Sequence, residues 1–135
     1  MRANVYLHFN GKCAAAFKFY EQCLNAKVAM TMTYGDSPAA AVHPELRDAV
    51  MHTRLVVGDT LIMGCDAPAD RYSKPQGFTV ALNTEDPAEV DRVFNALVVG
   101  GTVTMPLQET FWAKRFGMLV DQFGIAWMVN CEKTP

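Results

Sequence analysis

The stretch Gln108–Trp127, QETFWAKRFGMLVDQFGIAW, says most about the fold of this chain. Aromatic rings and charged side chains alternate closely along it, whereas strands inside a core rarely carry so many charges. One interpretation is an antiparallel hairpin with one solvated face. The other is a pocket wall, because pockets combine apolar area with a few placed polar groups. The aromatic residues concerned are Phe111, Trp112, Phe116, Phe123 and Trp127.

The second half of the chain, which contains this stretch, predicts one helix among four strands. The helix begins at Asp86-Pro87-Ala88-Glu89, with Asp86 as N-cap, Pro87 in the first turn and Glu89 closing a capping box. Gly100-Gly101 ends it. The predicted strands are Gly77–Asn83, Thr102–Leu107, Phe111–Val120 and Ala126–Cys131.

The first half predicts the same order of elements. Alternating residues make Val5–Phe9 a strand, and helical spacing of apolar residues marks a helix from about Lys12 to Asn25. Gly35–Asp48 has two prolines and no period, so it is predicted as a long loop. The remaining strands are Lys27–Tyr34, Ala49–Val57 and Thr60–Cys65.

The repeated order strand, helix, strand, strand, strand predicts an α+β fold built from two similar modules. A single helix covers only one face of each sheet, so the two uncovered faces are expected around a shared cleft. We predict one domain over residues 1–135, with module one at about 1–66, a linker at 67–76 and module two at about 77–131.

Composition narrows the classes of function. Twelve basic and fourteen acidic residues give a net charge of −2, which argues against a nucleic-acid partner. No apolar run approaches the ~20 residues of a membrane span, and the N-terminus lacks the apolar core of a signal peptide, so a cytoplasmic protein is expected. The four cysteines form no CxxC pair, so neither a zinc cluster nor a redox motif is predicted.

Several segments resemble the vicinal-oxygen-chelate superfamily of glyoxalase, bleomycin-resistance and extradiol dioxygenase proteins, and within it the PhnB-like branch. The most specific segment is Glu109–Trp112 followed by Phe116-Gly117 and Asp121–Trp127. The branch usually has proline where this chain has Gln122 and glycine where it has Ala113. The other matching segments are Tyr6–Gly11, Phe19-Tyr20, Val50–Thr53 and Leu61–Asp66.

The resemblance implies βαβββ modules in a cupped mixed sheet, and it also implies a metal site with one ligand from each of four strands. Those positions fall near His8, Met63 or Gly64, Phe78 and Met128, of which only His8 suits a hard or borderline divalent ion. The standard four-ligand site is therefore predicted to be missing. Some members are labelled demethylubiquinone methyltransferases, but a methyltransferase of the common kind needs a glycine-rich loop between a strand and a helix, and Gly100-Gly101 follows a helix.

Three residues are candidates for a catalytic or metal-binding role. His8 shares a strand face with Tyr6, and His52 shares one with Arg54, so both faces could line a pocket or be ordinary solvated faces. Glu109 could act as a base or ligand, or be an exposed strand-end carboxylate. If His8, His52 and Glu109 converge, they provide a non-standard site for a divalent metal ion.

A second group is predicted to line a ligand pocket. Trp112, Phe116 and Trp127 could form an aromatic wall, although core packing would explain each ring equally well. Tyr6 and Arg54 would add polar groups. Cys65, at the end of a strand, is either a pocket residue or a buried, inert thiol.

Three functions fit these predictions. The first is a small-molecule pocket protein that has lost the standard metal site. The second is a divalent-metal enzyme of lyase, isomerase or dioxygenase type that uses the non-standard ligand set. The third is a ligand-free structural or regulatory dimer. A homodimer is expected in each case, because superfamily members commonly pair their modules and because sheet edges need to be covered.

Overall fold

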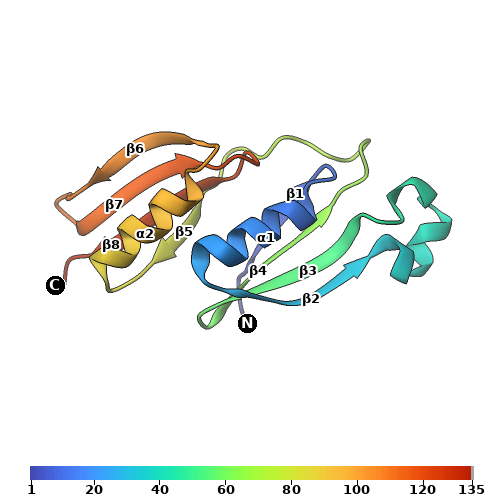
Figure 1. The fold of residues 1–135 in the computed structure, drawn as a ribbon, viewed down its shortest axis with the longest axis horizontal. Coiled ribbons are helices and arrows are strands. Elements are labelled where there is room, and N and C mark those ends of the chain that lie inside the picture. The colour runs from blue at the N-terminus through green and yellow to red at the C-terminus, as the bar shows by residue number, and fades with distance from the viewer. Residues whose placement is uncertain (135) are drawn as a thin grey trace. The chain divides into compact units, whose positions relative to one another are not determined.

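A computed structural model of the chain describes residues 1–134, which fold into two compact units that divide between Ser73 and Lys74. Each unit contains one four-stranded mixed sheet and one α-helix (Figure 1). The predicted α+β fold of two similar modules is therefore confirmed. Neither helix in the described part of the chain is long and apolar enough to cross a membrane.

The first unit has the strand order β1-β4-β3-β2. Strands β1 and β4 run parallel, whereas β4–β3 and β3–β2 are antiparallel. Strands β3 and β4 form a hairpin, with its turn at Gly58 and Asp59. The elements are β1 (Val5–Phe9), α1 (Cys13–Leu24), β2 (Lys27–Thr33), β3 (Val50–Val57) and β4 (Thr60–Asp66).

Helix α1 packs on one face of this sheet because alternate strand residues and the apolar stripe of the helix are both buried. Leu7 and Phe9 of β1 are buried, and the Phe9 ring meets the Phe17 ring of α1 edge-on with centroids 6.1 Å apart. Gly64 in β4 makes room for this packing, since a Cβ there would lie 2.7 Å from the Phe17 ring. Together these contacts form the core of the unit.

Asp66, which is 3% exposed, links three parts of the first unit. Its two carboxylate oxygens accept the backbone N–H groups of Cys13, at the start of α1, and Val50, at the start of β3, both at 3.0 Å. Lys12, the N-cap residue, provides no side-chain cap, so Asp66 satisfies a helix donor from a distant strand. The Tyr34 hydroxyl donates to the Asp66 carbonyl at 2.8 Å.

The second unit repeats this arrangement with the strand order β5-β8-β7-β6. Strands β5 and β8 are parallel, and the other two pairings are antiparallel, so the predicted hairpin in the aromatic stretch is β7–β8. The elements are β5 (Val80–Asn83), α2 (Pro87–Leu97), β6 (Thr102–Gln108), β7 (Ala113–Val120) and β8 (Ala126–Glu132).

The core of the second unit lies between α2 and its sheet. Trp127 is completely buried there, and its indole N–H donates to the buried Asp121 carboxylate at 2.8 Å. Asp121 also accepts the backbone N–H groups of Phe123 and Ile125, which closes the turn between β7 and β8. Gly117 admits the Phe94 ring, which a Cβ there would approach to 2.7 Å.

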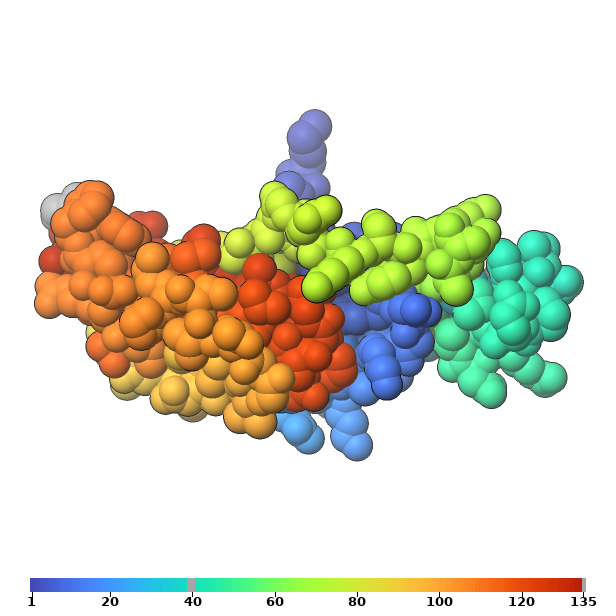
Figure 2. Space-filling view, turned by 90° about the horizontal axis from the view of Figure 1, so that it is seen from above, coloured from blue at the N-terminus to red at the C-terminus, as the bar shows by residue number. Residues whose placement is uncertain are grey.

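The segment predicted as a long loop contains three short 3-10 helices, η1 (Tyr34–Asp36), η2 (Pro38–Ala41) and η3 (Pro44–Leu46). They contact one another and form a lobe at one end of the first unit, teal in Figure 2. Thr33 and Asp36 form a capping box that starts the first of them. Local hydrogen bonds within the segment therefore give it structure without strand or α-helical periodicity.

Three details of the second unit differ from the sequence prediction. Strand β5 begins at Val80, three residues later than predicted, and β7 begins at Ala113 because residues 110 to 113 form a tight turn. Asp86 is the N-cap as predicted, accepting the Ala88 N–H at 3.0 Å. The capping box is absent, however, because the Asp86 N–H donates to Thr84 Oγ1 instead.

Candidate functional site

The candidate site lies on the open face of the first unit, which we define as the sheet face that α1 does not cover. Strand alternation and register place its residues in two rows. One row crosses the sheet as Tyr6, Met63, Arg54 and Met30. The other contains His8, Cys65, His52 and Met32.

Arg54, His52 and Tyr6 are joined by hydrogen bonds across this face. Arg54 Nε donates to His52 Nε2 at 3.0 Å, and His52 Nδ1 lies 2.9 Å from the Tyr6 hydroxyl. The Tyr6 and His52 rings are also stacked, with centroids 5.6 Å apart. Side chains from β1 and β3 thus meet above the intervening strand β4.

Cys65 and His8 extend the same network. The Cys65 Sγ lies 3.6 Å from His8 Nδ1, and the Tyr6 and His8 rings have centroids 5.2 Å apart. Burial and the adjacent Cys65 raise the pKa of the Tyr6 phenol. Burial also raises the pKa of the Cys65 thiol, although the Tyr6 hydroxyl opposes this by hydrogen bonding to it. Both groups are therefore protonated at neutral pH.

The chemistry of these groups assigns the direction of two hydrogen bonds. The Arg54 Nε–H can only donate, so His52 Nε2 accepts and the imidazole proton lies on Nδ1, which donates to Tyr6. The series therefore runs from Arg54 through His52 to Tyr6. Cys65 and His8 form a second pair beside Tyr6, in which either group can donate.

The open face carries basic groups without a matching carboxylate. Asp66 is the only acidic residue in the four strands of the first sheet, and both of its oxygens accept backbone N–H groups on the helix side. Arg54 is exposed, and no described residue accepts a hydrogen bond from either of its Nη atoms. The face therefore offers donors to an incoming molecule rather than acceptors.

These residues do not suit the divalent metal that the superfamily implies. The His52 Nε2 lone pair accepts from Arg54, whose positive charge opposes a cation at that position. Among residues 1–134, no three histidine, cysteine, aspartate or glutamate side chains lie close enough to share a metal ion. Glu109, the third residue of the proposed set, forms an ion pair with Lys133 at 2.8 Å, and this pair lowers the pKa of the Glu109 carboxyl.

The second unit holds the aromatic candidates, which differ in their environments. Trp112 is 41% exposed and meets the buried Phe116 ring edge-on, with centroids 5.3 Å apart. Phe111 is more exposed and packs against Trp112. Trp127 lies in the core beneath α2, and packing accounts for its position.

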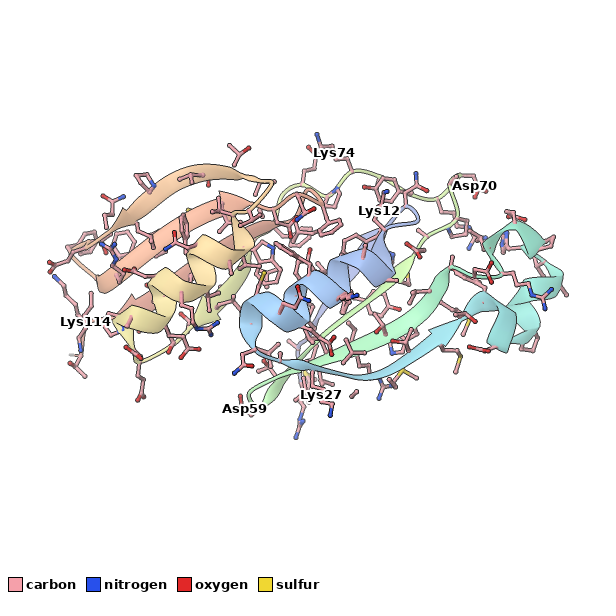
Figure 3. All side chains as sticks on the ribbon, in the orientation of Figure 1. Lys12, Lys27, Asp59, Asp70, Lys74 and Lys114 are labelled. Carbon is pink, nitrogen blue, oxygen red and sulfur yellow. The ribbon has the colours of Figure 1, made fainter. Side chains whose placement is uncertain are left out.

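A shallow pocket of about 740 Å³ lies at one end of the second sheet. Lys114, at the start of β7, extends away from the strand there (Figure 3). Nearby, Asn130 Nδ2 donates to Asn83 Oδ1 at 3.0 Å, while the buried Asn130 Oδ1 has no hydrogen-bond partner among the described residues. The sequence analysis missed this pair; the available signal was an asparagine within the apolar strand Ala126–Glu132.

Two βαβββ modules, each with one uncovered sheet face, define the glyoxalase-like vicinal-oxygen-chelate fold. A glyoxalase/bleomycin resistance protein/dioxygenase family enzyme from Burkholderia phytofirmans PsJN shares this fold, with a TM-score of 0.66 at 16% identity over 94% of each chain. The chain belongs to the PhnB-like family described as 3-demethylubiquinone-9 3-methyltransferase, whose model matches residues 2–130. The predicted superfamily and branch are thus confirmed.

Individual relatives span nearly the whole chain. Protein PA1353 from Pseudomonas aeruginosa is 44% identical, with a TM-score of 0.90 over 99% of both chains. Protein YjdN from Escherichia coli (strain K12) is 32% identical over 142 residues, or 98% of this chain and 97% of that protein. A putative 3-demethylubiquinone-9 3-methyltransferase, PhnB protein, from Bacillus cereus is 23% identical, with a TM-score of 0.79 over 96% and 98% of the two chains.

Proposed function

We propose that the protein binds a small organic molecule on the open face of the first unit. The observation that carries this proposal is a cluster of interacting polar side chains: Arg54, His52 and Tyr6 are hydrogen-bonded in series, and Cys65 and His8 form a second pair beside Tyr6. Polar side chains held in fixed orientations beside apolar ones are typical of ligand sites. A solvated sheet face has no need of such an arrangement, because water can satisfy each group separately.

Methyl transfer, the activity named in the family description, has little support in the residues described. Gly100 and Gly101 have structural roles, since a Cβ at Gly101 would collide with the Val120 carbonyl. Gly100, two residues beyond the C-cap Val98, has a φ of +75°, which favours glycine. The glycine pair therefore serves the passage from α2 to β6 rather than a cofactor loop.

Trp112 and Phe116 are proposed as additional ligand contacts. We also propose a homodimer. Strands β1 and β2 form the edges of the first sheet, and β5 and β6 form those of the second, so each sheet has unpaired backbone groups that a second copy could cover. Analytical ultracentrifugation would measure the oligomeric state.

The test is a thermal-melt screen with small organic acids, amides, alcohols and phenols, each measured with and without a chelator. A ligand that binds only the folded protein raises the melting temperature. We expect the increase to disappear in His52→Ala and to persist in His43→Ala. The latter removes a histidine that pairs with Glu45 in the first-unit lobe.

Two outcomes would contradict this proposal. An increase that survives in His52→Ala but disappears in Trp112→Ala would move the site to the second unit. A melting temperature that falls with chelator, together with stoichiometric metal in protein purified without a histidine tag, would favour the divalent-metal enzyme instead.

A further inference from the structure

We propose that the ligand is an organic oxyanion and that the Arg54 guanidinium binds its carboxylate or phosphonate group. This inference rests on the proposed function, because it names the chemical class of the molecule on the open face. It is carried by the orientation of Arg54, by the charges on the face and by the apolar neighbours of the guanidinium.

A hydrogen bond holds one edge of the Arg54 guanidinium in place. The Nε–H donates to His52 Nε2 at 3.0 Å, and His52 is held in turn by the Tyr6 hydroxyl at 2.9 Å. The two Nη groups of Arg54 remain available for a ligand. A planar guanidinium with free Nη groups matches the two oxygens of a carboxylate or phosphonate, and prior orientation reduces the entropy lost on binding.

The charges on the open face also favour an anion. No carboxylate of the first sheet competes for Arg54, because Asp66 lies on the helix side and binds two backbone N–H groups. The exposed His8 imidazole lies on the same face and adds a second group that can donate a hydrogen bond. Lys27 lies at the end of the sheet near Asp59 and the β3–β4 turn (Figure 3), so we do not include it in the site.

The residues beside Arg54 indicate the polarity of the rest of the ligand. Met63 on β4 and Met30 on β2 both pair with Arg54 in the register of the sheet, so a methionine lies on each side of Arg54 on the open face. Both methionines are partly exposed. Methionine adapts to apolar groups of varied shape, so an anion with an apolar or aromatic body fits this face better than an inorganic ion.

The experiment compares benzoate and phenylphosphonate with benzamide, which has nearly the shape of benzoate but no charge. Dissociation constants are measured by calorimetry on the full chain, and the Arg54→Met variant is tested alongside. We expect both anions to bind more tightly than benzamide, and Arg54→Met to weaken the tighter anion by about ten-fold or more. The ratio between the two anions distinguishes a carboxylate site from a phosphonate site.

Two further variants control for nonspecific effects. Arg92→Met removes the same charge from α2 in the second unit and should leave binding unchanged. Arg54→Lys keeps the charge but loses the planar fork, so it should bind with intermediate affinity. Circular dichroism melts establish that each variant is folded.

The possible results separate the two proposals. Benzamide binding as tightly as benzoate, with His52→Ala still weakening both, would overturn the anion inference and leave the small-molecule site in place. Equal loss of anion binding in Arg92→Met and Arg54→Met would overturn it too, because binding would then follow net charge alone. If none of the three probes binds, or if binding is unaffected by Arg54→Met, the anion inference fails. Binding that is also unaffected by His52→Ala contradicts both proposals.

Discussion

The two units share one scaffold but differ on their open faces. In the first unit the open face carries Arg54, His52 and Tyr6 in a hydrogen-bonded series, with the pair Cys65 and His8 beside it. In the second unit, the register places mainly apolar residues and one amide pair on the corresponding face. These residues are Phe116, Met118, Met128 and the pair Asn83 and Asn130.

On the sheet faces that the helices cover, in contrast, the two units share two structural features. Each unit buries one carboxylate that accepts backbone N–H groups, Asp66 in the first and Asp121 in the second. Each unit also places a helix aromatic ring on a strand glycine, Gly64 or Gly117. The helix side therefore specifies the fold, whereas the open side is free to vary with function.

The largest effect is expected from removing the buried carboxylates. Asp66→Ala leaves the N–H groups of Cys13 and Val50 without an acceptor, at a cost of about 1–3 kcal/mol each. Asp121→Ala should cost at least as much, because three donors lose their acceptor. Urea denaturation measures both changes. Asp70→Ala, an exposed position in Figure 3, is the control, and a loss for Asp66→Ala no greater than for this variant would contradict the shared role.

Adding a methyl group at the paired glycines should have the next largest effect. In Gly64→Ala the new Cβ would lie 2.7 Å from the Phe17 ring, and overpacking of this kind typically costs about 1–3 kcal/mol. Gly117→Ala should behave similarly against Phe94.

Shortening the facing ring tests the mechanism of this effect. If the contact is responsible, Gly64→Ala combined with Phe17→Leu should lose less stability than the sum of the two single variants, as measured by calorimetric melts. Simple additivity of the two losses would show that the ring contact is not what limits residue 64.

Alkaline pH should affect the first unit through its buried thiol at Cys13. Burial and the neighbouring Asp66 raise the pKa of this thiol above its ordinary value of 9.0. Below about pH 9 both the folded and unfolded states keep the proton, so stability does not depend on this group. Above that pH the unfolded thiol ionises first, and stability falls.

The measurement is the melting temperature of wild type and Cys13→Ala from pH 7 to pH 11. The melting temperature of Cys13→Ala should fall less steeply above pH 9 than that of wild type, once the difference between the two proteins at pH 7 has been subtracted. Identical slopes would show that Cys13 does not couple folding to pH.

The smallest effect is expected at the second-unit ion pair. Lys133 lowers the pKa of the Glu109 carboxyl in the folded state, and Glu109→Gln removes this ion pair. The contribution of this pair is present above the unfolded pKa of Glu109 and is lost as pH falls through the lower folded value. Because the carboxylate is exposed, the loss in Glu109→Gln should be small and should vanish at 1 M salt. A loss that persists at that salt concentration would indicate a role beyond this ion pair.

Much of the fold follows from the sequence because short-range periodicity and turn residues determine it. The alternation in Val5–Phe9 correctly separated the buried Leu7 from the exposed His8, and Asp86-Pro87 correctly located the start of α2. The start of β7 was predicted two residues too early, because Phe111 and Trp112 have strand-like composition but lie in a turn that Thr110 closes.

The candidate site could be predicted only in part. The spacing of Tyr6 and His8, and of His52 and Arg54, identified two polar strand faces. Their meeting, however, depends on β4 lying between β1 and β3, which is a matter of strand order that local sequence does not encode. Trp127 shows the opposite difficulty, because an aromatic residue beside charged ones looks like a pocket wall even when its partner, Asp121, is buried with it.

The central claim is that the ligand binds the open face of the first unit rather than that of the second. Methionine methyl NMR tests it directly, because both faces carry methionines: Met30 and Met63 beside Arg54, and Met118 and Met128 on β7 and β8. Benzoate titrated into methyl-labelled protein is predicted to shift the Met30 and Met63 signals, and Arg54→Met should abolish those shifts. Shifts confined to Met118 and Met128 would contradict the claim.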